Sequence, residues 1–317
     1  MSKISDGLHI GENASPPPFE VGKSAVSKFW DVIKGNGWPL VKINLLTLLF
    51  FLPLIVWQII VTFTATADAV LLPYSGNIGI GLPVVTDAVA VGAARAFSVS
   101  VRRWLFTVPM IPVGAIGLSG AFYALKRLVL EGEKPTVKAF FKGIARSWLP
   151  FLLTSVFVAL AIFALFYSIA SYSVTTDLHI VLKITEIISS ALLLVITLLM
   201  ALFVNTQSVS YKLKFGANFS NSVRFSVMLF PRSIVILALC ALPIVVTCLV
   251  SGFIATILIA FFLLIGFSFI ALIATVYTQW AFEKYLNGKI RGKNNAKPTE
   301  SRKEKKRRMA AEAKSEE

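Results

Sequence analysis

Side chains that do chemistry inside a membrane are usually ionisable groups near its centre, and the apolar segments of this sequence carry none there. A charge in hydrocarbon is costly, so pumps and ion-coupled transporters keep such groups only for function. The inner polar side chains are instead uncharged amides. We expect these amides to make intramembrane polar contacts, with other helices or with a transported solute: Asn44, Gln58, Asn205 and Gln207.

Cysteine and histidine are too scattered to form a metal site. Cys240 and Cys248 share one apolar segment but lie about 12 Å apart along a helix, which is too far for a disulfide. His9 and His179 are distant in sequence from each other and from both cysteines. The chain also lacks a P-loop, an HExxH motif and a GxSxG motif. We therefore expect no metal, no cofactor and no enzymatic activity.

Composition indicates the structural class in which these side chains must be placed. The chain has 317 residues, of which 56% are hydrophobic and 15% charged, with a mean hydropathy of +0.77. Soluble domains are about one quarter charged. Several apolar runs are about 20 residues long, enough to cross a hydrocarbon core about 30 Å thick. The sequence predicts an all-α, polytopic membrane helical bundle.

We expect six transmembrane helices in a membrane domain over 39–282, between an arm at 1–38 and a disordered basic tail at 283–317. The six spans are placed at about 40–66, 104–125, 148–172, 184–209, 233–250 and 253–280. Residues 67–103 carry glycines, prolines and charges, which favours an extracytoplasmic or re-entrant insertion with a surface helix near 84–101; an extra span is the alternative. A cleaved signal peptide at the first span is disfavoured because some forty residues precede it.

Amphipathic segments flank these spans. Residues 23–34 place Val26, Phe29, Trp30 and Ile33 at helical spacing, which predicts an interfacial helix. Residues 135–148 and 216–230 mix basic and aromatic side chains and predict short helices at the membrane surface. Three cations of the first of these are expected to contact anionic lipid or a partner protein: Lys138, Lys142 and Arg146.

The formal net charge of +15 is distributed unevenly between the two sides of the membrane. With six spans, all but four of the 31 Lys and Arg residues fall on one side. The positive-inside rule then predicts a multi-pass protein of the cell (inner) membrane with both termini in the cytoplasm. The tail contains a basic run expected to bind anionic lipid or a partner: Arg302, Lys303, Lys305, Lys306, Arg307 and Arg308. No aromatic residue interrupts this run, so specific nucleic-acid binding is not expected.

Small residues in the second span predict a helix-packing face. Gly114, Gly117 and Gly120 recur every three residues, and Ala121 lies four residues after Gly117. Small side chains at this spacing let a second helix approach closely.

The stretch 114–150, preceded by an Asn-Leu helix that contains Leu52-Pro53, resembles the YesL-like family of bacterial integral membrane proteins. The matching positions are Asn44, Leu45, Pro53, Gly117, Ala121, Tyr123, Phe140 and Phe141. Residues 67–103 and the basic tail depart from the family pattern. The family is of uncertain function. The resemblance implies a small helical bundle associated with ATP-driven carbohydrate uptake, and it supplies no catalytic residues.

Taken together, these features predict an auxiliary or scaffold subunit of a membrane transport complex, without catalytic chemistry of its own. Two alternatives stay open. The chain can be a transporter or channel in its own right, with a polar path near Gln58, Asn205 and Gln207. It can also be a membrane interaction protein that recruits a cytoplasmic assembly through its basic tail.

Overall fold

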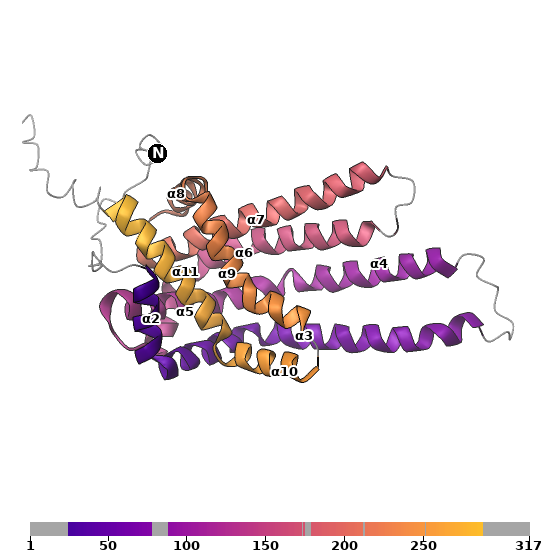
Figure 1. The fold of residues 1–317 in the computed structure, drawn as a ribbon, viewed down its shortest axis with the longest axis horizontal. Coiled ribbons are helices and arrows are strands. Elements are labelled where there is room, and N and C mark those ends of the chain that lie inside the picture. Colours follow the sequence, from indigo (N-terminus) through magenta and orange to yellow (C-terminus); the bar gives the residue numbers. More distant parts are fainter. Residues whose placement is uncertain are drawn as a thin grey trace, which may run out of the picture.

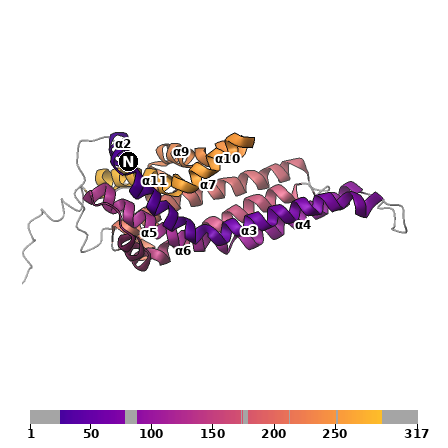
Figure 2. The same ribbon diagram turned by 90° about the horizontal axis from the view of Figure 1, so that it is seen from below.

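The chain forms an all-α polytopic membrane bundle (Figure 1, Figure 2). A computed structural model describes residues 25–77, 88–172, 174, 179–211, 213–250 and 252–287. Within these ranges, six helices are long and apolar enough to cross a membrane. The helices are α2 (Ala25–Gly35), α3 (Gly37–Asn77), α4 (Ala88–Thr107), α5 (Met110–Glu131), α6 (Val137–Ser171), α7 (Ile180–Ser210), α8 (Phe215–Met228), α9 (Phe230–Leu249), α10 (Gly252–Phe261) and α11 (Phe267–Phe282), with π-helical turns η1 (Phe262–Gly266) and η2 (Glu283–Asn287).

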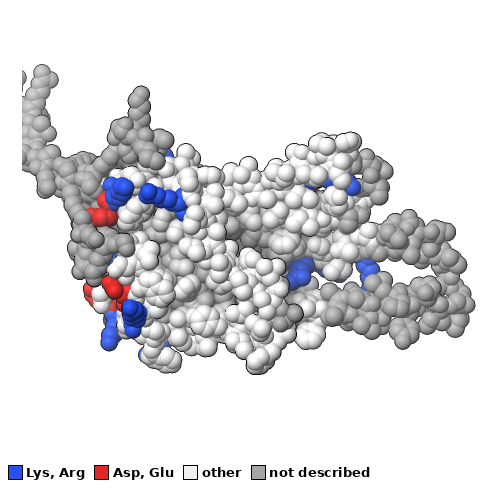
Figure 3. All heavy atoms as spheres, viewed as in Figure 1, with Lys and Arg blue, Asp and Glu red and all other residues white. Residues whose placement is uncertain are grey.

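Lys and Arg side chains gather at one end of the bundle, where α2, the connection between α5 and α6, and η2 lie (Figure 1, Figure 3). We call this end the basic end. At the opposite end, α3, α4, α6 and α7 reach well beyond the turn between α9 and α10 (Figure 1). The α9–α10 pair is therefore a short hairpin beside four longer helices.

Residues 88–103 differ from the expected re-entrant or surface-lying segment. They belong to α4, which leads into α5 through a break at Val108-Pro109, so that one candidate span covers Ala93–Glu131. Proline cannot donate a backbone hydrogen bond, which accounts for a break at this point. Aromatic rings hold α4 beside α6: the Trp104 ring stacks on Phe166 with centroids 3.7 Å apart. Residues 78–87 lie outside the described residues.

The amphipathic segments follow two different patterns. α2 is the expected separate helix before the first span, with Phe29 and Ile33 packed against the core and Trp30 exposed. α8 is also separate. The expected surface helix over 135–148 is instead the beginning of α6, which continues without interruption into the third span. Thr136 begins α6 as its N-cap, because its hydroxyl accepts a hydrogen bond from the Ala139 N–H at 3.1 Å.

The last span continues further than expected. α11 and η2 extend helical structure to Asn287, and Phe282 and Leu286 are buried. The expected start of the tail at 283 is therefore several residues too early. The predicted disorder of the tail, and the arm before residue 25, concern residues outside the described ranges.

Two apolar clusters form the core. The larger cluster joins α3, α5, α6 and α11, with the fully buried Leu40, Phe140, Phe151 and Leu272 among its members. The second joins α7, α8 and α11 around Phe203, whose ring stacks on Phe225 with centroids 5.4 Å apart. The α9–α10 hairpin stands apart from this packing, since only 6% of the apolar window of α9 is buried.

The small-residue face of α5 contacts two helices. Gly114 lies against the ring of Phe51 and Gly117 against Phe50, both on α3. Gly120 faces Phe140 on α6, where an added Cβ atom would lie 2.9 Å from the Phe140 backbone oxygen. Ala121 is fully buried in the main core. The spacing of these residues therefore brings α5 close to α3 on one side and α6 on the other.

Replacing Gly120 by alanine should destabilise the bundle. A backbone oxygen cannot move aside as the end of a flexible side chain can, so we expect Gly120→Ala to lower the free energy of unfolding by about 1–3 kcal/mol. Unfolding of the purified protein in detergent measures this. Gly216→Ala is the control, because no atom lies within 4 Å of the added Cβ. Equal stability of the two variants would contradict the close approach of α5 and α6.

Candidate functional site: buried polar side chains

Asn44 on α3 joins the first span to the last. Its side chain is fully buried. The amide nitrogen donates to the Leu263 carbonyl at 2.6 Å, and the amide oxygen accepts from the Ser268 N–H at 3.0 Å. Leu263 lies within the π-helical turn η1 and Ser268 lies just after it, where the regular pattern of helical hydrogen bonds is interrupted. Asn44 therefore supplies the donor and the acceptor that this interruption requires.

A second bond reinforces the same junction. The Ser268 hydroxyl donates to the Leu40 carbonyl at 2.9 Å, one helical turn before Asn44. Aromatic packing surrounds the turn, because Phe51 stacks on Phe267 with centroids 4.4 Å apart. Asn44 is thus a structural contact between helices, with its amide nitrogen and its amide oxygen each bonded to the last span.

Gln58 makes a second interhelical contact, about halfway along α3. Its amide oxygen accepts two hydrogen bonds from the Arg103 guanidinium, at 2.9 and 2.7 Å. Its amide nitrogen donates to the Thr107 hydroxyl at 2.9 Å. The Trp57 ring nitrogen donates to the Arg103 backbone carbonyl at 3.2 Å. Four bonds therefore hold α3 to the end of α4, next to the break at Pro109.

Gln207 differs from Asn44 and Gln58, because its buried amide makes no hydrogen bond within the described part of the chain. The side chain is fully buried on α7, and neither its oxygen nor its nitrogen has a hydrogen-bond partner among the described residues. One turn earlier, the Val204 carbonyl accepts a bond from the Asn218 amide of α8 at 3.1 Å. The Asn218 oxygen and the Asn205 oxygen are likewise buried without a partner in the described part of the chain.

These unpartnered atoms are energetically unfavourable. A buried polar atom without a partner costs about 1–3 kcal/mol, so such groups normally bind water or a ligand. The contact between α7 and α8 is therefore the place in the described bundle where a polar group from outside the chain would be stabilised most. Gln207, which the sequence singled out, and Asn218, which it did not, contribute to this contact.

Other polar side chains near α7 and α8 have partners across helices. The Gln279 amide of α11 donates to the Ser210 hydroxyl of α7 at 2.6 Å. The hydroxyls of Ser233 on α9 and Tyr277 on α11 are hydrogen-bonded at 2.8 Å. Both pairs tie the last span to its neighbours.

The expected basic contacts lie on the surface of the basic end. Lys138, Lys142 and Arg146 are exposed and follow one another at four-residue spacing, so they share one side of α6. The Arg146 guanidinium lies 5.9 Å from the centre of the Tyr123 ring. This row can meet lipid phosphates or an acidic protein surface. The tail cations at 302–308 lie outside the described residues.

Sequence reasoning missed Arg103, Ser268 and Asn218 as partners. The sequence places Arg103 in a connecting segment, because Arg102 and Arg103 together interrupt the apolar run. Ser268 and Asn218 are small polar residues of common types, so only their positions opposite Asn44 and Val204 give them a role.

Among the described residues, no group of three or more His, Cys, Asp or Glu side chains could hold a metal ion.

A double-mutant cycle should detect the contact between Gln58 and Arg103. We expect Gln58→Leu and Arg103→Met to lower the free energy of unfolding individually. The double variant should lose less than the sum, with a coupling of about 1–2 kcal/mol, because bonds to a charged donor are stronger than neutral ones. Unfolding in detergent measures the three variants. Strictly additive losses would mean that the two side chains do not interact.

Comparison of the chain with protein-family models, with curated proteins and with solved structures finds no match.

Proposed function

We propose that the protein is a scaffold subunit of a membrane transport system, located in the bacterial inner membrane with both termini in the cytoplasm. Carbohydrate uptake is the class of transport that the YesL-like resemblance suggests. The observation that carries the proposal is the use of polar side chains inside the spans. Asn44, Gln58 and Gln279 all bond across helix pairs, so they hold the bundle together and do not line a path.

The α9–α10 hairpin supports a scaffold role from another direction. Leu249 and Phe253 flank the hairpin turn and are 79% and 78% exposed. The hydrogen bonds of Asn44 join α3 to η1 and α11, and those of Gln58 join α3 to α4. By contrast, α9 and α10 contribute little to the core. A face of this kind can be covered by the helices of another membrane protein without changing the rest of the bundle.

The orientation is supported by the distribution of charge. Described Lys and Arg residues are concentrated at the basic end (Figure 3). The order of the six candidate spans leaves four cations toward the other side: Arg95, Arg102, Arg103 and Lys183. The positive-inside rule assigns the richer end to the cytoplasm.

A transporter in its own right is the second candidate, and Gln207 is the observation that favours it. Its two unpartnered amide atoms offer hydrogen bonds to a polar solute. The Asn205 oxygen on α7 and the Asn218 oxygen on α8 are further buried acceptors without a partner among the described residues. In this alternative, the contact between α7 and α8 opens to form part of the path.

The two candidates differ in what the purified chain does alone. A scaffold subunit should co-purify from native membranes, in mild detergent, with the membrane-spanning subunits of a transport system. Proteoliposomes that contain only this chain should take up labelled sugars no faster than protein-free vesicles. Recovery of the chain without such subunits would contradict the proposal.

Uptake by the chain alone would also contradict it, and would support the transporter. In that case Gln207→Leu should abolish uptake. The control is Thr206→Val, because Thr206 is equally buried but bonds the Leu202 carbonyl of its own helix at 2.7 Å. Loss of uptake in both variants would indicate a general effect on packing, and the path would have to lie elsewhere.

A further inference from the structure

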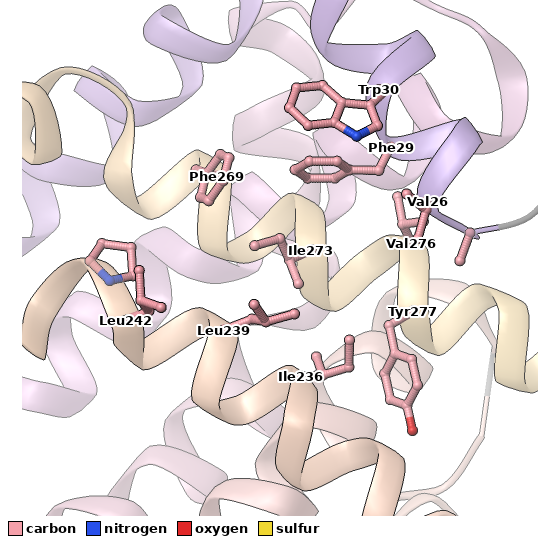
Figure 4. A pocket seen from close by; sticks show the side chains of 12 residues that line it. Val26, Phe29, Trp30, Ile236, Leu239, Leu242, Phe269, Ile273, Val276 and Tyr277 are labelled. Atoms are coloured by element: carbon pink, nitrogen blue, oxygen red, sulfur yellow. The ribbon is translucent and has the colours of Figure 1, made fainter.

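An apolar groove of about 350 Å³ lies between α2, α9 and α11 (Figure 4). Its walls are formed by Val26, Phe29 and Trp30 from α2, by Leu239 from α9, and by Phe269 and Ile273 from α11, among others. The volume falls in the range of about 300–1,000 Å³ that small-molecule sites occupy. The groove is thus large enough for part of a ligand, and its lining requires that part to be apolar.

The groove has a direction across the membrane. On α11, Phe269, Ile273 and Tyr277 follow one another at four-residue spacing and line it. Continuing the same stripe leads to Trp280 and then Lys284 at the basic end. The distance along the helix from Phe269 to Trp280 is about 16 Å, which is half of a hydrocarbon core about 30 Å thick. The stripe from Phe269 in the groove to Trp280 at its basic end therefore matches one leaflet in depth.

Two cations stand at the basic end of this stripe. The Arg232 guanidinium lies 5.3 Å from the centre of the Trp280 ring, and the Lys284 ammonium lies 5.5 Å from it. Trp280 stacks on Tyr277, a lining residue, with ring centroids 6.1 Å apart. Arg232 begins the facing stripe on α9, which continues through Ile236 and Leu239 into the groove. The side chains of Arg232 and Lys284 are both exposed.

We propose that this groove binds an anionic phospholipid, with an acyl chain between α2, α9 and α11 and its phosphate held by Arg232 and Lys284. An acyl chain satisfies the apolar lining, and a negatively charged headgroup satisfies the two cations above it. Trp280 lies between them, at the level where aromatic side chains prefer the membrane interface. This inference is independent of the scaffold role and of any transported solute.

Depth and charge together select this occupant. A wholly apolar ligand would leave the two cations without a counter-charge. A free phosphate would leave the groove unfilled. A phospholipid in the leaflet at the basic end has its charged headgroup at the membrane surface and its acyl chains deeper in the membrane. This order matches the stripes on α9 and α11, which have cations at the basic end and apolar side chains beyond them. α2 then acts as the outer wall of the site, since its Trp30 and Val26 are exposed as well as lining the groove.

Lipid titration of the intact, full-length protein tests the proposal. Binding of phosphatidylglycerol and of phosphatidylcholine with the same acyl chains is followed by mass spectrometry of the protein released from detergent. We expect the anionic lipid to bind more tightly. Replacing both cations, Arg232→Gln with Lys284→Gln, should weaken its binding about 30-fold, at roughly 1 kcal/mol per cation. The control pair Lys134→Gln with Lys214→Gln removes equal charge from exposed positions outside the groove, before α6 and before α8, and should change binding by less than threefold.

The acyl chain is tested separately by filling the groove. Leu239→Trp should weaken both lipids while leaving Arg232 and Lys284 in place. Ile188→Trp, on an exposed part of α7 away from the groove, should weaken neither.

Three results would overturn the proposal. Equal binding of the two wild-type lipids would remove the role of the cations. Equal loss in the two charge pairs would reduce the effect to general electrostatics. A photo-crosslinker at Leu239 that attaches to a protein chain in native membranes would show that a protein occupies the groove.

Discussion

Inside hydrocarbon, each backbone N–H and C=O needs a partner, and the last span of this protein meets that requirement with help from the first. The π-helical turn at Phe262–Gly266 interrupts the regular hydrogen bonding of a long apolar helix. The Asn44 amide bonds one backbone group within this turn, the Leu263 carbonyl, and one just after it, the Ser268 N–H. Residues more than two hundred positions apart are thereby fixed to each other, and the first and last spans become neighbours.

The geometry of the basic end follows from this junction. α10 and α11 run in different directions on the two sides of η1 (Figure 1). α11 therefore leaves the line of the α9–α10 hairpin and packs against α2, where Phe29 meets Phe269 with ring centroids 5.6 Å apart. The groove lies in the space that this change of direction leaves between α9, α11 and α2.

Much of the fold is predictable from the sequence because hydropathy and length determine what can cross a bilayer. The six spans, the amphipathic α2 and the packing glycines of α5 are all local patterns. The sequence predicts a helix near 84–101, but its moderate hydropathy and its arginines do not show where this helix packs. Only the long-range contacts of Trp104 with α6 and of Arg103 with α3 place it along the bundle. Likewise, the sequence identified Asn44 and Gln207 as polar groups in apolar surroundings, but not that one is bonded and the other is not.

The central claim is that Asn44 supplies the hydrogen bonds that the π-helical turn needs. Hydrogen–deuterium exchange of the reconstituted protein, followed over residues 262–268, tests it most directly. Asn44→Leu keeps the size of the side chain and should speed exchange at this turn, with a loss of about 1–2 kcal/mol in the free energy of unfolding. Thr47→Val is the control, since Thr47 bonds the Ile43 carbonyl within α3 and should leave the turn unchanged. Exchange in Asn44→Leu as slow as in the wild type would contradict the account.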